Sequence, residues 1–171
     1  MTTVIRGPRP EVEAFLERRR LLGQDRLDEV WEGVYVVAPD PTSDHSEIAG
    51  LLWAVLRAHA QEHGLRAVAT FNLGAKGDFR VPDAGLLPRS ERGVWISTAL
   101  LVVEVLSPDD ATFDKIGFYA AKGVRELLVA DPDAHTVRVL DLQAGGADVD
   151  ASAVLGWTRA QLEAAVDWPT D

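Results

Sequence analysis

The most constraining feature of this sequence is a nearly continuous run of apolar, largely β-branched residues from Leu100 to Leu106. Such a run predicts a strand that is covered on both faces of a sheet. One carboxylate, Glu104, interrupts it, and a buried carboxylate without a partner would cost several kcal/mol. We therefore expect a cation near Glu104, and Lys115 on the next predicted helix is in a position to supply it.

The rest of the pattern predicts a mixed α/β (α+β) sheet in one domain over residues 1–171. A helical arm covers 1–26, a core 27–142, and a loop with a short helix 143–171. Asp44 and Glu47 resemble a capping box that starts the longest helix. The turn at 72–78 would join its flanking strands as an antiparallel pair. The predicted helices are 10–22, 44–63, 112–122 and 158–166; the predicted strands are a hairpin at 27–38, then 66–73, 79–87, 100–107, 126–131 and 136–142.

Composition narrows the class of protein. The chain has 171 residues, 47% of them hydrophobic, which is enough for one sizeable core. It has no cysteine, which excludes disulfides and Cys-ligated zinc. No stretch is apolar enough to span a membrane or to form a signal-peptide core, so we expect a soluble cytoplasmic protein. The net charge of −10 argues against broad, non-specific attraction to nucleic acid.

A second acid, Asp83, follows Val81 and Pro82 on the preceding strand candidate. Two carboxylates near the middle of one sheet repel each other unless a cation lies between them, and Mg²⁺ (or Mn²⁺) prefers oxygen ligands. A metal-bound water is a better nucleophile, and Lys115 would orient it. The alternative is structural: Asp83 caps a turn and Glu104 forms a salt bridge with Lys115.

Four stretches carry a family resemblance. VPDAGLLP, LLVVEVLSP and DKIGFYAAKGVRELLVADP resemble the Uma-two family of restriction-endonuclease-like proteins, a branch of the PD-(D/E)XK nuclease superfamily. EVWEGVYVVAPDPTSDHSEIAGLL is similar to that family's hairpin, loop and helix opening, so the resemblance covers roughly 27–142. It implies a restriction-endonuclease-like mixed central sheet flanked by helices, with an N-terminal helix and hairpin. It also implies a divalent-metal site in which Asp83 is the Pro-Asp aspartate and Glu104 the second acid.

The resemblance also assigns supporting residues. The wider superfamily places its lysine two residues after the second acid, where this chain has Leu106. The Uma-two branch moves the lysine to the following helix in a Lys-x-x-x-Tyr spacing, which Lys115 and Tyr119 match. His45 lies near the histidine that precedes the family's first long helix, where it would donate to a phosphate or a metal-bound water; the alternative is an exposed capping neighbour. Glu32 is a candidate for the extra acid that such nucleases carry on an N-terminal element.

A rival motif lies at the end of the predicted helix 44–63. His59, Glu62 and His63 form the H-x-x-E-H signature of inverted zinc peptidases, with two histidines on one helix face. The pentad directly precedes Gly64, where histidines complement the helix dipole without any metal. We keep a zinc peptidase as a remote alternative.

The leading hypothesis is a Mg²⁺-dependent endonuclease that hydrolyses DNA. The alternative is a catalytically inactive nuclease-fold module used for binding, which the acidic composition and the lack of a clear basic stripe favour. Trp157, Val166 and Trp168 would either close the core or bury a partner surface in a homo-oligomer, such as a dimer. Asp109 and Asp110 are expected to belong to a solvated acidic loop.

Overall fold

The architecture rests on a mixed six-stranded sheet, seen in a computed structural model that describes residues 3–5, 10–108 and 111–169. The acidic loop expected at Asp109 and Asp110 lies outside these residues. The strand order is β12-β11-β10-β9-β7-β4, with β9 and β10 parallel and the other pairs antiparallel. The strands are β4 (Arg66–Ala69), β7 (Ala84–Leu87), β9 (Leu101–Val105), β10 (Glu126–Asp131), β11 (Thr136–Asp141) and β12 (Ala147–Val149).

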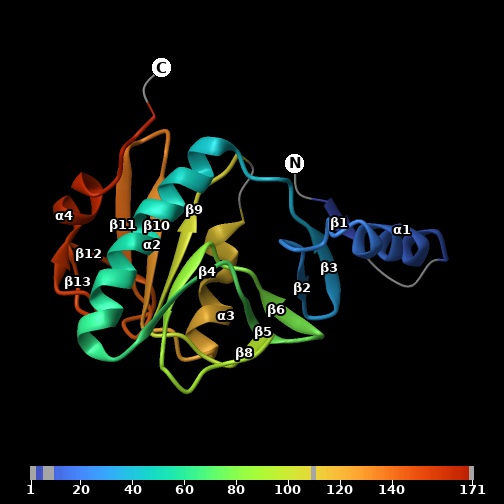
Figure 1. Cartoon of the computed structure of the whole chain (residues 1–171), viewed down its shortest axis with the longest axis horizontal. Helices are drawn as coiled ribbons and strands as arrows, with labels where there is room; N and C mark the ends of the chain where they lie inside the picture. Colours follow the sequence, from blue (N-terminus) through green and yellow to red (C-terminus); the bar gives the residue numbers. More distant parts are fainter. Residues whose placement is uncertain (1–2, 6–9, 109–110, 170–171) are drawn as a thin grey trace.

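The apolar run forms β9, and all five of its residues are buried, as predicted. Because side chains alternate along a strand, Val103 and Val105 pack toward the core beneath α2 (Ser43–His63), which crosses that face of the sheet (Figure 1). Val102 packs toward the opposite face, in the core that contains Tyr119. Glu104 alternates with its neighbours in the same way and therefore faces the side of Tyr119.

A parallel crossover brings the next helix onto that side. Parallel strands such as β9 and β10 need a long connection, and here it contains a 3₁₀ turn, η1 (Thr112–Lys115), followed by α3 (Ile116–Ala121). The predicted helix 112–122 is thus present, although its first turn is 3₁₀. Tyr119 is fully buried, so the helix packs closely on the sheet.

A second six-stranded sheet, with the order β1-β3-β2-β6-β5-β8, holds the N-terminal hairpin. The two long strands predicted at 66–73 and 79–87 are each broken, so one half pairs in each sheet. Pro82 lies at the break and has no N–H for a strand ladder. The strands are β1 (Thr3–Ile5), β2 (Glu29–Trp31), β3 (Val34–Val37), β5 (Asn72–Ala75), β6 (Asp78–Arg80) and β8 (Trp95–Ile96).

Several boundaries differ from the predictions. The arm 1–26 contains α1 (Pro10–Leu21), which projects from the body of the molecule, but also the unpredicted strand β1 (Figure 1). The cap of α2 is Thr42 rather than Asp44, because the Thr42 hydroxyl accepts the N–H of His45 at 3.2 Å. Gly64 ends α2 with a φ of 66°, a left-handed conformation that suits glycine.

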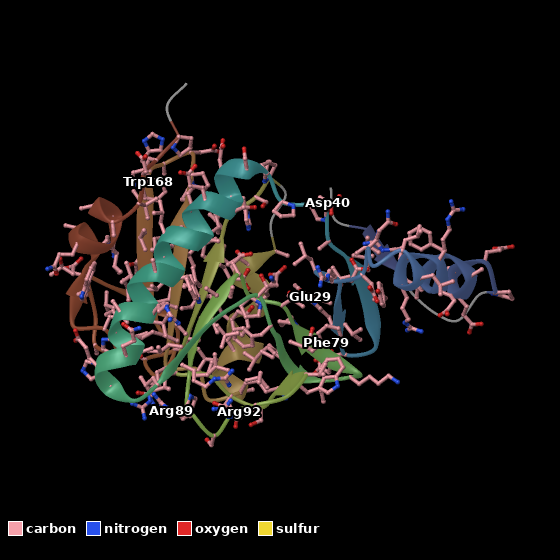
Figure 2. The ribbon with its side chains drawn as sticks, viewed as in Figure 1. Glu29, Asp40, Phe79, Arg89, Arg92 and Trp168 are labelled. Carbon is pink, nitrogen blue, oxygen red and sulfur yellow. The ribbon has the colours of Figure 1, made fainter. Side chains whose placement is uncertain are left out.

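The C-terminal segment is more ordered than the predicted loop. Residues 143–152 include β12 and β13 (Ala151–Ser152), and β13 pairs with β14 (Trp157–Thr158). α4 (Arg159–Ala164) is shorter than the predicted 158–166, and Thr158 caps it in a capping box with Gln161. Val166 is buried in the core beneath α2, and Trp157 packs against that core. Trp168, labelled in Figure 2, packs against the same core. These three side chains thus close the protein's own core.

Candidate active site

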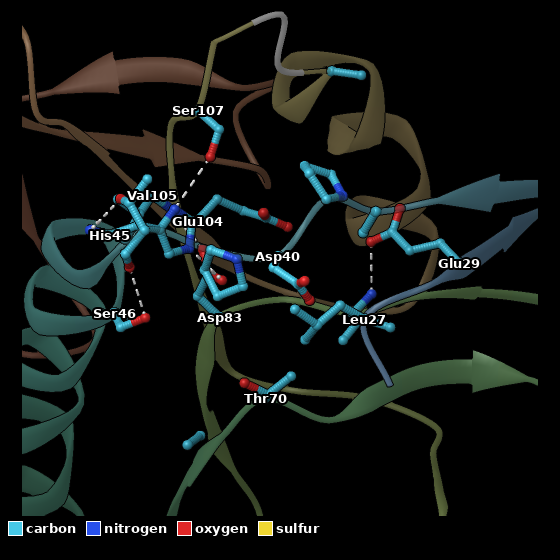
Figure 3. A pocket seen from close by; sticks show the side chains of 18 of the residues that line it. Leu27, Glu29, Asp40, His45, Ser46, Thr70, Asp83, Glu104, Val105 and Ser107 are labelled. Atoms are coloured by element: carbon cyan, nitrogen blue, oxygen red, sulfur yellow. Dashed lines mark hydrogen bonds and ion pairs between the residues drawn. The ribbon is translucent and has the colours of Figure 1, made fainter. Parts of the chain in front are cut away.

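A cavity of about 490 Å³ lies where α2, the β2–β3 hairpin and the ends of β4, β7 and β9 meet (Figure 3). Asp83, Glu104 and Lys115 all line it, so the structure brings the three predicted catalytic residues to one place. The first half of α2 forms one wall, and the hairpin forms the facing wall. Apolar side chains such as Leu27, Val36 and Trp53 line much of the remaining surface.

Glu104 and Lys115 form a close ion pair in this cavity. Lys115 Nζ lies 3.1 Å from each carboxylate oxygen of Glu104. The Tyr119 hydroxyl donates a hydrogen bond to Oε1 of the same carboxylate. Since Lys115 and Tyr119 are one helical turn apart, both reach the single acid of β9. The expected cation for the buried carboxylate is therefore present.

Burial dominates the electrostatics of this cluster. It raises the pKa of Glu104 to about 8, and the nearby carboxylates of Asp83 and Glu29 add to that rise, while Lys115 and Tyr119 oppose it. Burial on its own lowers the pKa of Lys115, but the charges of Glu104 and Glu29 outweigh it and raise that pKa above its ordinary value. Lys115 is therefore an ammonium that donates hydrogen bonds, rather than a base.

Asp83 is held by the backbone of β9. Its N–H donates to the carbonyl of Val103 at 3.0 Å, and its Oδ2 accepts the N–H of Val105 at 2.8 Å. These contacts place the aspartate directly beside the strand that carries Glu104. Its other oxygen, Oδ1, lies 3.0 Å from Nε2 of His45.

His45 belongs to the cavity wall, so the alternative of an exposed capping neighbour is wrong. Its side chain is 15% exposed, and Nδ1 lies 3.2 Å from the Ser107 hydroxyl. The two ring nitrogens thus connect Asp83 with the end of β9 (Figure 3). A histidine fixed at both nitrogens orients its carboxylate partner.

The acid that the N-terminal hairpin contributes is Glu29, not Glu32. Glu32 lies in the exposed β2–β3 turn with φ of 50°, outside the cavity lining, and its N–H donates to Asp78 Oδ1 at 3.0 Å. Glu29 points into the space between the hairpin and the central sheet, and its Oε1 lies 3.1 Å from Lys115 Nζ (Figure 2). The signal available in the sequence was strand position: Glu32 directly precedes Gly33 of the turn, whereas Glu29 lies within the strand.

The histidine pentad lies elsewhere. His59 and His63 stack at 3.9 Å on the last turn of α2, and His63 Nδ1 lies 2.9 Å from the carbonyl of His59. Neither they nor Glu62 line the cavity. Across residues 3–5, 10–108 and 111–169, no group of three or more His, Asp or Glu side chains is arranged to hold a metal ion. Within the same ranges, no helix combines the length and apolar character needed to cross a membrane.

The mixed sheet, its flanking helices and the hairpin that covers one end define a restriction endonuclease-like fold. The chain belongs to the Uma2 family, described as "Putative restriction endonuclease", whose sequence profile matches residues 12–166. This match confirms the resemblance found in the sequence.

Two solved structures are similar to this chain. A "putative nuclease belonging to DUF820" from Anabaena variabilis is 19% identical, with a TM-score of 0.69 over 82% of this chain and 92% of that chain. A DrdV–DNA complex is 21% identical, with a TM-score of 0.41 over 63% of this chain and 10% of that chain. The search among curated proteins found no match.

Proposed function

We propose that this protein is a nuclease that uses Mg²⁺ or Mn²⁺ to hydrolyse phosphodiester bonds in DNA. The observation that carries the proposal is the convergence of Asp83, Glu104 and Lys115 in one cavity. Lys115 Nζ is 3.1 Å from both oxygens of Glu104 there. Membership of a restriction endonuclease family supports the same class of chemistry.

The residues present fit a divalent cation. Mg²⁺ is commonly bound through one or two carboxylates, and waters and substrate phosphate complete its coordination. Asp83 and Glu104 supply two such carboxylates at the wall of an open cavity, which leaves room for waters and a phosphate. The pKa of Glu104, raised by burial, also indicates a carboxylate that added positive charge would stabilise. Asp83 and Glu104 would therefore hold the metal, which when bound supplies an activated water and neutralises developing negative charge.

The chain's own residues would position the other reactants. In the hydrolysis, a water oxygen bonds to phosphorus and gives up a proton, the bond from phosphorus to the leaving oxygen breaks, and that oxygen takes up a proton, so one water is consumed. Lys115, which remains an ammonium, would donate hydrogen bonds to the attacking water or to a phosphoryl oxygen. Tyr119 would keep the carboxylate of Glu104 oriented, and His45 would do the same for Asp83.

A binding module without catalysis is the second candidate. Lys115 and Tyr119 already occupy the carboxylate oxygens of Glu104, which is an arrangement that needs no metal. The net charge of −10 also opposes broad contact with a phosphate backbone. In such a module the three residues would only stabilise the fold.

The test compares Mn²⁺-stimulated DNA cleavage by the wild type with that by Asp83→Asn, Glu104→Gln and Lys115→Met. Glu62→Gln, at an exposed acid on the far end of α2, is the matched control. The nuclease proposal expects the three site variants to lose metal-stimulated cleavage while they remain folded by circular dichroism, and the control to keep it. Wild-type cleavage by a site variant would remove that residue from the mechanism. If Mn²⁺ does not stimulate DNA cleavage by any of the five proteins, the binding module is favoured.

A further inference from the structure

Arg80, at the end of β6, is enclosed between two aromatic rings. Its guanidinium carbon lies 4.5 Å from the centre of the Trp31 ring and 4.1 Å from the centre of the Phe118 ring. Trp31 belongs to β2 of the hairpin, and Phe118 belongs to α3. The side chain is buried, so water does not screen these cation–π contacts. Arg80 therefore joins the hairpin to the helix that follows Lys115.

The hydrogen bonds of Arg80 are unevenly distributed. Nη1 donates to the carbonyl of Val30 at 2.9 Å, to Asp78 Oδ1 at 3.0 Å and to the carbonyl of Phe79 at 3.1 Å. Nε is buried and has no hydrogen-bond partner among the residues that the structure describes. An arginine paired with a carboxylate usually presents both edges of its fork. The geometry here is instead the one that places the flat guanidinium between two rings.

The ring of Trp31 leads directly to the cavity. Its Nε1 donates to Glu29 Oε2 at 2.5 Å. The other oxygen of Glu29 accepts the N–H of Val81 at 2.8 Å and lies 3.1 Å from Lys115 Nζ. Contacts thus run without interruption from Arg80 through Trp31 and Glu29 to the ammonium of Lys115.

The Phe118 ring holds Arg80 against α3, the helix that follows Lys115. Phe118 follows Lys115 by three residues, about one helical turn, and Arg80 packs against the face of the Phe118 ring. Arg80 therefore restrains both partners of the Glu29–Lys115 ion pair: the carboxylate through Trp31, and the ammonium through α3. Without Arg80, the hairpin and α3 would lose the cation that lies between their rings.

We propose that Arg80 and Trp31 are positioning residues that hold Glu29 against Lys115 and so keep the ammonium beside Glu104. Neither residue touches the reacting atoms. The consequence for catalysis rests on the proposed nuclease function, but the placement of the ammonium does not.

The test follows the ammonium directly. The chain has three lysines, so ¹⁵N-labelled lysine gives a simple side-chain spectrum in which Lys115 is assigned from Lys115→Met. Arg80→Met removes the cation, Arg80→Lys restores one, and Trp31→Phe keeps an aromatic ring but removes the indole N–H. Trp95→Phe is the control, since Trp95 packs on Phe79 and lies outside the cavity lining.

The proposal expects the Lys115 ammonium protons to exchange with water about tenfold faster in Arg80→Met and in Trp31→Phe, in line with the loss of one hydrogen bond to a charged group. Arg80→Lys recovers part of the protection, and Trp95→Phe matches the wild type. An unchanged Lys115 signal in both Arg80→Met and Trp31→Phe overturns the proposal. If Arg80→Met does not fold, Trp31→Phe decides alone.

Cleavage kinetics then separate the two proposals. If the wild type cleaves DNA, kcat falls about tenfold in Trp31→Phe while KM stays within about twofold, because phenylalanine keeps an aromatic ring at this place in the cavity lining. A faster-exchanging ammonium with unchanged kcat overturns the catalytic consequence. A wild type that cleaves nothing contradicts the nuclease function, and the exchange measurement still decides the positioning role.

Discussion

The ammonium of Lys115 lies 3.1 Å from both carboxylate oxygens of Glu104, although one residue belongs to a central strand and the other to the turn before a helix. The parallel connection between β9 and β10 folds that helix back over the strand, so the contact follows from topology. A buried acid and its cation then share a cavity with Asp83.

Metal affinity should rise with pH. Burial raises the pKa of Glu104 to about 8, so as the pH falls below that value the carboxyl takes up a proton, its ion pair with Lys115 becomes a hydrogen bond, and a metal must displace the proton to bind. We expect Mn²⁺ affinity to increase by up to about tenfold per pH unit between about pH 6 and pH 8, with about one proton released per metal at the lower end. Calorimetry in two buffers with different ionisation enthalpies measures both. A pH-independent affinity without proton release would contradict the role of Glu104.

His45 should tune the metal site through Asp83. Its Nε2 lies 3.0 Å from Asp83 Oδ1, and loss of such an orienting contact typically weakens metal binding roughly 10- to 100-fold. We expect His45→Ala to lose Mn²⁺ affinity by that factor in a calorimetric titration. His59→Ala, on the same helix but outside the cavity, is the control and should bind as the wild type does. Equal affinities in the two variants would show that His45 does not support the site.

Filling the cavity should reduce cleavage without destabilising the fold. Gly50 lies on the cavity wall in the middle of α2, and a Cβ added there meets no heavy atom within 4 Å. We expect Gly50→Leu to stabilise the helix by about 0.5–1 kcal/mol, because glycine is a poor helix former, and yet to lower kcat/KM. Thermal unfolding and DNA cleavage measure the two effects.

Ala58→Leu is the control for this experiment. Ala58 is an exposed position on the same helix, two turns further along and outside the cavity lining. Ala58→Leu should leave the free energy of unfolding and the rate of DNA cleavage close to those of the wild type. Full cleavage by Gly50→Leu would mean that substrate does not enter this cavity.

Glu29 and Glu32 offer a matched pair of acids on one hairpin. Glu29→Gln removes the second charge beside Lys115, so it should lower the pKa of Lys115 and reduce kcat/KM by about tenfold, the usual cost of a weakened hydrogen bond to a charged group. Glu32→Gln, in the exposed turn, should stay within about twofold of the wild type. The comparison is made on the same DNA substrate at one pH. A larger loss in Glu32→Gln would restore the assignment expected from the sequence alone.

Local patterns were enough to predict the strand of Glu104 and the helical turn that pairs Lys115 with Tyr119. Both depend on properties that neighbouring residues carry: a β-branched apolar run, a Ser-Pro strand end, and a four-residue spacing on a helix. The long helix α2 followed from its apolar periodicity for the same reason. Its cap did not, because Thr42 and Asp44 are both good caps and only the chain's path decides between them.

The strand position of Glu29 could be seen in the sequence, but its contact with Lys115 could not be predicted, because that contact depends on where a whole hairpin lies. β2 pairs with β6 through a single residue pair, Val30 with Phe79, and the hairpin reaches it only because the predicted strand 79–87 is broken at Pro82 between two sheets. The residues around Glu29 in the sequence do not indicate where that strand breaks. Arg80, between its two rings, is the residue through which this long-range placement is fixed.

The most direct measurement of the central claim is an anomalous difference map from a crystal soaked in Mn²⁺. The account predicts one peak in the cavity, coordinated by Asp83 and Glu104, with Lys115 Nζ within hydrogen-bond reach of its water shell. Asp83→Asn crystals soaked in the same way should lose the peak. A metal peak elsewhere, for example between His59 and His63, would contradict the account. So would a soaked crystal with no metal beside Glu104 in which Lys115 still contacts both carboxylate oxygens.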